Sequence, residues 1–223
     1  MSISLEFDCD DDAEQQAIKQ QYIEILRPGP SKGNYGAVGA TTDSEVILEN
    51  LPPLRVLNAT LDTVRMNGLA RVLIHSGKHL VKLMGPCPGN LPEDYQDYLR
   101  LLEAIRKLPN LEYFHWQTSI YYTILDLDNT NMRQHDRNRT IVDFSVDFSV
   151  DAIVRAILES GAVLKTLVLF SCPMASLLQH LLVRCKTTLE DLVLKRLGSH
   201  RVVKVLSKFL SREDCHLHAV DIT

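Results

Sequence analysis

A short apolar pattern recurs along most of this chain, and its spacing constrains the fold more than any other feature. An apolar residue is followed by apolar residues three and five positions later, and copies begin 26, 31, 30, 23, 25 and 28 residues apart. One copy cannot bury its apolar face alone, so a near-regular period in this range predicts a stacked array of small units. The copies are Leu54/Leu57/Ala59, Leu80/Leu83/Gly85, Leu111/Phe114/Trp116, Ile141/Phe144/Val146, Leu164/Leu167/Leu169, Leu189/Leu192/Leu194 and Leu217/Val220/Ile222, and only Gly85 departs from the pattern.

Stretches with helical spacing separate most of these copies. Apolar residues recur at three- and four-residue steps in 98–108, 153–157, 177–185 and 202–210, which predicts a helix after each short strand. Residues 62–77 fit less well, because Asn67-Gly68 falls inside the helical stretch. A doubly wound parallel sheet also alternates strands and helices, but the short strands, the near-regular steps and the missing glycine fingerprint favour a solenoid.

Two segments carry a resemblance to a known family. Residues 164–172 read Leu-Lys-Thr-Leu-Val-Leu-Phe-Ser-Cys, and residues 189–194 read Leu-Glu-Asp-Leu-Val-Leu. Both resemble the leucine-rich repeat consensus L-x-x-L-x-L-x-x-N/C, with Cys172 on the Asn/Cys position. The repeat length and helical second halves are similar to the ribonuclease-inhibitor-like and F-box-associated branch. The resemblance implies an α/β solenoid of six to seven strand-helix repeats, with a parallel concave sheet and helices on the convex face.

The first 45 residues differ from the rest, since 32 of the 34 leucines lie after residue 47. Residues 1–14 hold six carboxylates and no basic side chain, residues 13–26 have helical spacing, and residues 28–40 hold four glycines and two prolines. We expect an acidic N-terminal tail with a short helix and a Gly/Pro linker at 1–45. The leucine-rich repeat domain follows at 46–223, with an irregular insertion at about 117–140.

The residues between the inward-pointing leucines are the candidate binding residues, because successive strand side chains point to opposite faces of a sheet. Aromatic residues flanked by charges are typical of protein-binding hot spots. Packing of Val168, Val193 and Phe170 under another segment is the alternative. The predicted partner-binding residues are Tyr113, His115, Gln117, Asp143, Ser145, Asp147, Thr166, Val168, Phe170, Asp191 and Lys195.

Motifs for catalysis or for a cofactor are not recognisable in the sequence. His75 with His79 lacks the glutamate of a His-Glu-x-x-His zinc site, and Cys215-His216-x-His218 has no second cluster of ligands. The glycines at 33, 36 and 39 do not match a phosphate-binding loop. We therefore expect no enzymatic activity, no metal and no cofactor.

Charge and hydropathy narrow the partner class. Residues 184–212 hold eight basic and two acidic side chains, but few aromatic residues interleave with them, so nucleic acid is not the expected partner. The acidic tail folding back on this basic run is an alternative.

Residues 166–183 lack charges but contain Pro173, which predicts a strand and a helix rather than a membrane span. No secretory signal is recognisable, which favours a cytoplasmic or nuclear protein.

These observations predict a non-enzymatic module that binds another protein on its concave sheet. The resemblance implies two narrower alternatives. One is the substrate-recognition part of an SCF-type ubiquitin ligase receptor, although no F-box is visible in residues 1–45. The other is a regulator of a small GTPase, since some leucine-rich repeat proteins act on such enzymes.

Overall fold

The leucine pattern builds one sheet whose strands alternate with helices. The computed structural model describes residues 4–7, 11–26, 48–59, 64, 66–85, 95–116, 150–170, 173–195, 200–212 and 216–222. The strands are β1 (Ser4–Glu6), β2 (Val56–Asn58), β3 (Lys82–Met84), β4 (Tyr113–Trp116), β5 (Thr166–Leu169), β6 (Asp191–Leu194) and β7 (Ala219–Ile222). The helices are α1 (Asp12–Leu26), α3 (Met66–Ser76), the 3-10 helix η1 (Gly77–His79), α4 (Tyr95–Ile105), α6 (Val150–Ser160), α7 (Ala175–Arg184) and α8 (His200–Leu210).

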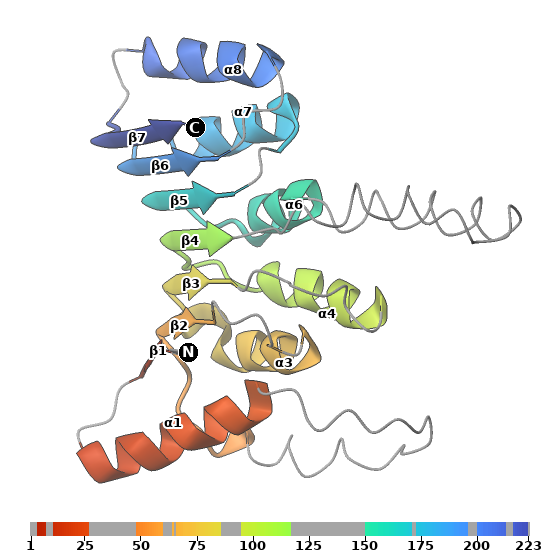
Figure 1. The fold of residues 1–223 in the computed structure, drawn as a ribbon, viewed down its shortest axis with the longest axis vertical. Coiled ribbons are helices and arrows are strands. Elements are labelled where there is room, and N and C mark those ends of the chain that lie inside the picture. The colour runs from red at the N-terminus through yellow and green to blue at the C-terminus, as the bar shows by residue number, and fades with distance from the viewer. Residues whose placement is uncertain are drawn as a thin grey trace, which may run out of the picture.

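The strand order follows the chain from β1 to β7 without a reversal. Strands β2 to β7 pair in parallel, whereas β1 pairs antiparallel with β2. Helices α3 to α8 lie on one side of the sheet (Figure 1). A doubly wound sheet needs a reversal of strand order and helices on both faces. The expected alternation of strands and helices in an α/β fold with a mostly parallel sheet is therefore confirmed for the described residues.

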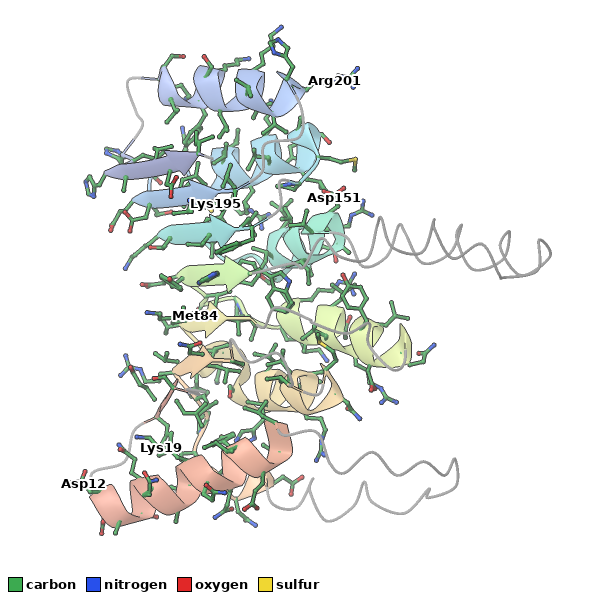
Figure 2. All side chains as sticks on the ribbon, viewed as in Figure 1. Asp12, Lys19, Met84, Asp151, Lys195 and Arg201 are labelled. Atoms are coloured by element: carbon green, nitrogen blue, oxygen red, sulfur yellow. The ribbon has the colours of Figure 1, made fainter. Side chains whose placement is uncertain are left out.

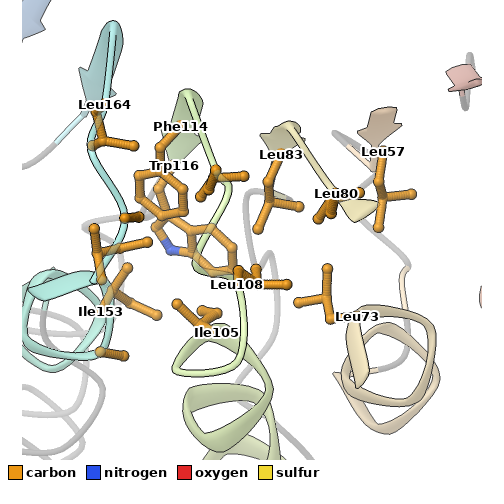
Figure 3. Close-up of a cluster of buried hydrophobic side chains, with 14 of the residues drawn as sticks. Leu57, Leu73, Leu80, Leu83, Ile105, Leu108, Phe114, Trp116, Ile153 and Leu164 are labelled. Carbon is orange, nitrogen blue, oxygen red and sulfur yellow. The ribbon is translucent and has the colours of Figure 1, made fainter. Parts of the chain in front are cut away.

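Leucines and aromatic residues in register fill the space between sheet and helices. One row crosses the sheet through Leu57, Leu83, Phe114 and the two leucines that follow, and each side chain is at most 1% exposed. Figure 3 shows part of this row facing Leu73 and Ile105 from the helices. Full burial of each leucine contributes about 1.5–3 kcal/mol. The pattern found in the sequence therefore marks the core, except in the last copy, where Val220 and Ile222 are exposed.

The N-terminal residues belong to the same core, and residues 4–7 pack against it although the sequence suggests an acidic tail there. Leu5 in β1 and Phe7 beyond it are buried, and the Phe7 and Tyr22 ring centroids lie 6.4 Å apart. The Tyr22 hydroxyl donates a hydrogen bond of 2.6 Å to the carbonyl oxygen of Pro52. The expected helix at 13–26 is confirmed as α1, and its buried residues Ile18, Tyr22 and Leu26 cover this end of the sheet. The alternation of Leu5 and Phe7 is what allows an acidic segment to pack.

The third and fifth copies of the pattern are neighbours in the sheet, whereas the spacing predicts a strand from the fourth copy between them. Strand β4 pairs directly with β5, from Tyr113 opposite Thr166 to Trp116 opposite Leu169. Residues 117–149, which include the expected insertion, and Cys172 on the Asn/Cys position lie outside the described residues.

Gly85 is the one irregular position of the pattern, and Trp116 explains it. A Cβ added at Gly85 would lie 2.0 Å from the Cε3 atom of the Trp116 ring. Trp116 is 2% exposed and stacks on Phe114 with ring centroids 5.8 Å apart. The indole thus fills the volume that the apolar residue of the second copy would take.

Gly68 has a similar role between two helices. A Cβ added there would lie 2.4 Å from the carbonyl oxygen of Ile25 in α1. Gly68 is buried in the first turns of α3, so α1 approaches α3 closely at this point. The glycine that weakens the helical pattern in the sequence is therefore a packing requirement.

We predict that Gly85→Ala lowers the free energy of unfolding by about 1–3 kcal/mol, because a rigid indole ring cannot yield to the added methyl group. Urea unfolding followed by circular dichroism measures this. The same substitution should cost less in a Trp116→Leu background, where the six-membered ring is absent. Equal costs in both backgrounds would show that the indole is not what requires the glycine.

We predict that Gly68→Ala destabilises the protein by about 1–2 kcal/mol, although alanine favours a helix by about 1 kcal/mol over glycine. The added methyl group meets the main chain of α1, which must move away. Asn67→Ala at the neighbouring position is the matched control and should be neutral or slightly stabilising. A Gly68→Ala protein more stable than the parent would contradict the close approach of α1.

Candidate functional site

The side chains between the buried leucines form one surface on the sheet side away from the helices, which we call the open face. In β2 to β6 they are half-buried, whereas the residues between them are buried. Figure 2 labels Met84 at β3 and Lys195 at the end of β6. The predicted residues Tyr113, His115, Thr166, Val168, Phe170, Asp191 and Lys195 lie here, and Gln117, Asp143, Ser145 and Asp147 lie outside the described residues.

One row of the open face crosses β3 to β6 and contains two polar contacts. Its members Lys82, Tyr113, Thr166 and Asp191 are in register. The Lys82 ammonium lies 4.3 Å from the centre of the Tyr113 ring, and the Thr166 hydroxyl donates a 3.3 Å hydrogen bond to Asp191. Burial, with the charge of Asp191, raises the pKa of the Tyr113 hydroxyl. Tyr113 is therefore a neutral, positioned ring.

A second row is more apolar and centres on His115. It runs from Met84 through His115 to Val168 and Val193. The His115 ring stacks on Phe170, with centroids 5.4 Å apart and planes 8° from parallel. Burial lowers the pKa of His115 from its ordinary value of 6.5, and its Nε2 atom has no hydrogen-bond partner among the described residues. His115 is therefore expected to be neutral at pH 7.

Two contacts of this surface join neighbouring strands, and sequence spacing predicts the neighbours for only one of them. The stack of His115 on Phe170 arises because β4 pairs directly with β5, whereas the spacing predicts a strand between them. Lys195 forms an ion pair with Asp221 of β7. Asp221 and Lys82 both occupy outward strand positions, and this alternation is the signal that identifies them.

The aromatic and acidic side chains of the open face contact one another or a neighbouring polar group. Its aromatic rings are stacked or lie under a cation, and its acidic groups Asp191 and Asp221 contact Thr166 and Lys195. Within the described ranges, no three His, Cys, Asp or Glu side chains gather as metal ligands. The His75 Nε2 atom lies 2.9 Å from the Leu51 carbonyl oxygen, which gives that histidine a structural role.

The described acidic and basic segments lie far apart. Helix α1 lies at the β1 end of the sheet, and α8 lies at the β7 end (Figure 1). The described residues of the acidic head therefore do not fold back on the basic run.

Residues 166–183 form β5 and α7 around two residues that are not described, as the sequence predicts. None of the helices in the described ranges has both the length and the hydropathy needed to cross a bilayer.

Comparison with known proteins adds no relative. No family model matches this chain, and no curated protein or solved structure is significantly similar to it. Functional inference therefore depends on the open face and on the ends of the sheet.

We predict that His115 makes stability depend on pH. Its lowered folded-state pKa means that unfolding takes up a proton below about pH 6.5, so the free energy of unfolding falls as pH decreases. His115→Phe keeps a ring against Phe170 but cannot titrate. Urea unfolding from pH 5 to 7.5 should show the stability of the parent, relative to the variant, rising with pH and then levelling off. A difference that does not vary with pH would contradict the burial of His115.

Proposed function

We propose that this chain is a non-enzymatic protein-interaction module, a short leucine-rich repeat solenoid whose open face binds a partner protein. The observation that carries this proposal is a group of half-buried rings on neighbouring strands: Tyr113 and His115 both face outward from β4, and the Phe170 ring stacks on His115. Aromatic residues at the centre of a surface, with charged residues at its edge, are the composition of protein-binding hot spots.

Three features support the solenoid. The strands follow chain order, β2 to β7 are parallel, and the helices lie on one side of the sheet (Figure 1). All three positions of the pattern also point inward, as in Leu164, Leu167 and Leu169, which are at most 1% exposed. A stack of strand-helix units buries its leucines in this way.

The order of the open face supports binding. The Lys82 ammonium lies over the Tyr113 ring, and the Phe170 ring stacks on the His115 ring. Side chains that already occupy one conformation lose less entropy when a partner docks. Met84, Val168 and Val193 add apolar surface, and the Lys195–Asp221 ion pair lies at the edge. A partner segment with an apolar or aromatic side chain at its centre fits this surface.

The narrower roles that the resemblance implies are distinguished by the partner itself. A ubiquitin ligase receptor would bring down a Skp-type adapter. A GTPase regulator would bring down a small GTPase and change its rate of GTP hydrolysis. Both roles, and residence in the cytoplasm or nucleus, rest on the sequence.

We predict that Tyr113→Ala/Phe170→Ala weakens partner binding by at least about tenfold, since each substitution removes a large ring from the centre of the surface. Affinity capture from native extract, followed by mass spectrometry, identifies the partner, and titration with the purified partner gives the affinity. The matched control is Ile74→Ala/Val183→Ala, because these side chains lie on the helices and are 47% and 49% exposed. The control should bind like the parent.

Circular dichroism and urea unfolding must show that both double variants remain folded. A folded Tyr113→Ala/Phe170→Ala protein that captures the same partner with parental affinity would contradict binding at the open face. Loss of the fold in that variant would show instead that the two rings belong to the core.

A further inference from the structure

The two ends of the sheet are finished differently. At the first end, β1 runs antiparallel and α1 covers the core, with Tyr22 and Leu26 fully buried. Helix α1 exposes no large apolar side chain. At the other end, β7 and α8 expose four large apolar side chains: Val203, Leu210, Val220 and Ile222.

The apolar layer is incomplete beside β7. Val220 and Ile222 are in register with Leu192 and Leu194 of β6. The two leucines are fully buried, whereas Val220 is 40% exposed and Ile222 is 36% exposed. These are the inward positions of the last copy of the pattern, so this copy has the scaffold residues but lacks cover in the described part of the chain.

The main chain of β7 also presents hydrogen-bonding groups at this edge. In the preceding strands, inward-pointing residues direct their carbonyl oxygens to the next strand, as Trp116 does to the Phe170 amide and Leu169 to the Lys195 amide. The same alternation points the peptide groups of Val220 and Ile222 away from β6. No described strand pairs with that side of β7. An edge with such groups is a template for a further strand.

Helix α8 at this end is strongly basic, and Asp221, the acidic residue of β7, is paired with Lys195. Residues 200–212 contain Arg201, Lys204, Lys208 and Arg212 and no carboxylate. Figure 2 shows Arg201 on α8 at the end opposite Asp12 and Lys19 of α1. A segment that docks beside β7 therefore enters a positive field, which favours an acidic segment.

A second copy of the chain fits this edge poorly in either orientation. If two β7 edges paired, two basic α8 helices would come close together. If the β1 end of another copy docked here, its α1 would offer acidic groups but no large exposed apolar side chain to cover Val220 and Ile222. The edge requires acidic and apolar groups in one extended segment.

We propose that β7 accepts an added strand from an extended acidic segment of another protein, with apolar residues at alternate positions. Main-chain hydrogen bonds to Val220 and Ile222 hold the strand, its apolar side chains cover this end of the core, and its carboxylates face the cations of α8. This mode of recognition is β-strand addition. It is separate from binding at the open face, and either surface can operate without the other.

Strand β1 provides a probe, because its segment is acidic, has alternating apolar residues and already extends the opposite edge of this sheet. The probe is a free peptide of residues 2–12 carrying Cys9→Ser, and the control peptide has every Asp and Glu replaced by Lys. Titration into the ¹⁵N-labelled full chain should shift the amide signals of Val220 and Ile222. The control peptide should not bind, and raising the salt concentration should weaken the acidic peptide.

Two protein variants test the main-chain and charge contributions. Val220→Pro removes the outward N–H while keeping the bonds of β7 to β6, and Val220→Thr is the matched control that keeps the N–H. Val220→Pro should weaken the peptide by about tenfold or more, and Val220→Thr should not. Lys204→Glu/Lys208→Glu should weaken it by a similar factor, whereas Lys78→Glu/Arg155→Glu, with the same charge change on other helices, should not.

Several outcomes would overturn the proposal. They are no binding by the parent chain at millimolar peptide, shifts confined to β2 where the peptide displaces β1, and equal affinities for Val220→Pro and Val220→Thr. Light scattering that shows self-association lost in Val220→Pro would assign the edge to a second copy. None of these results bears on partner capture by the open face.

Discussion

Burial of each strand-helix unit against its neighbours is the interaction on which the rest of the structure depends. A strand of three or four residues with one helix has too little apolar surface to fold alone, so the units are stable only together. The row from Leu57 across Leu83 and Phe114 shows this directly, since each side chain packs between adjacent units. Once these residues point inward, the alternation of the strands places the remaining side chains on the open face. Scaffold and candidate site are thus two results of one pattern.

The sequence predicts the scaffold well because burial is periodic. The positions of Leu164, Leu167 and Leu169 follow from spacing, and spacing also identifies Tyr113 and His115 as outward residues. Neighbours across the sheet are harder to predict. The spacing places a strand from residues 141–146 between β4 and β5, yet Tyr113 pairs directly with Thr166. The stack of His115 on Phe170 follows from that pairing and not from any local motif.

Two other results depend on volume, which a pattern of apolar and polar residues does not describe. Gly85 breaks the pattern because Trp116 needs its space, and Gly68 weakens a helical stretch because α1 passes close by. The acidic head shows the opposite problem. Its carboxylates suggest a solvated segment, whereas Leu5 and Phe7 need only two inward positions to join the core. In each case the contacts of one or two residues decide the local packing, and the average polarity of the segment does not.

The reversed direction of β1 gives the molecule a polarity. A parallel unit continues a sheet because each new strand begins at the same end as the one before it, after its helix has crossed back. Strand β1 runs in the opposite direction. Another strand-helix unit could therefore not be added beside β1 with the crossover that joins the parallel strands. Growth of such an array is therefore possible in one direction only. Strand β1 therefore closes its edge of the described sheet to a unit of this kind, whereas β7 keeps the direction of the parallel strands and can still be followed by another.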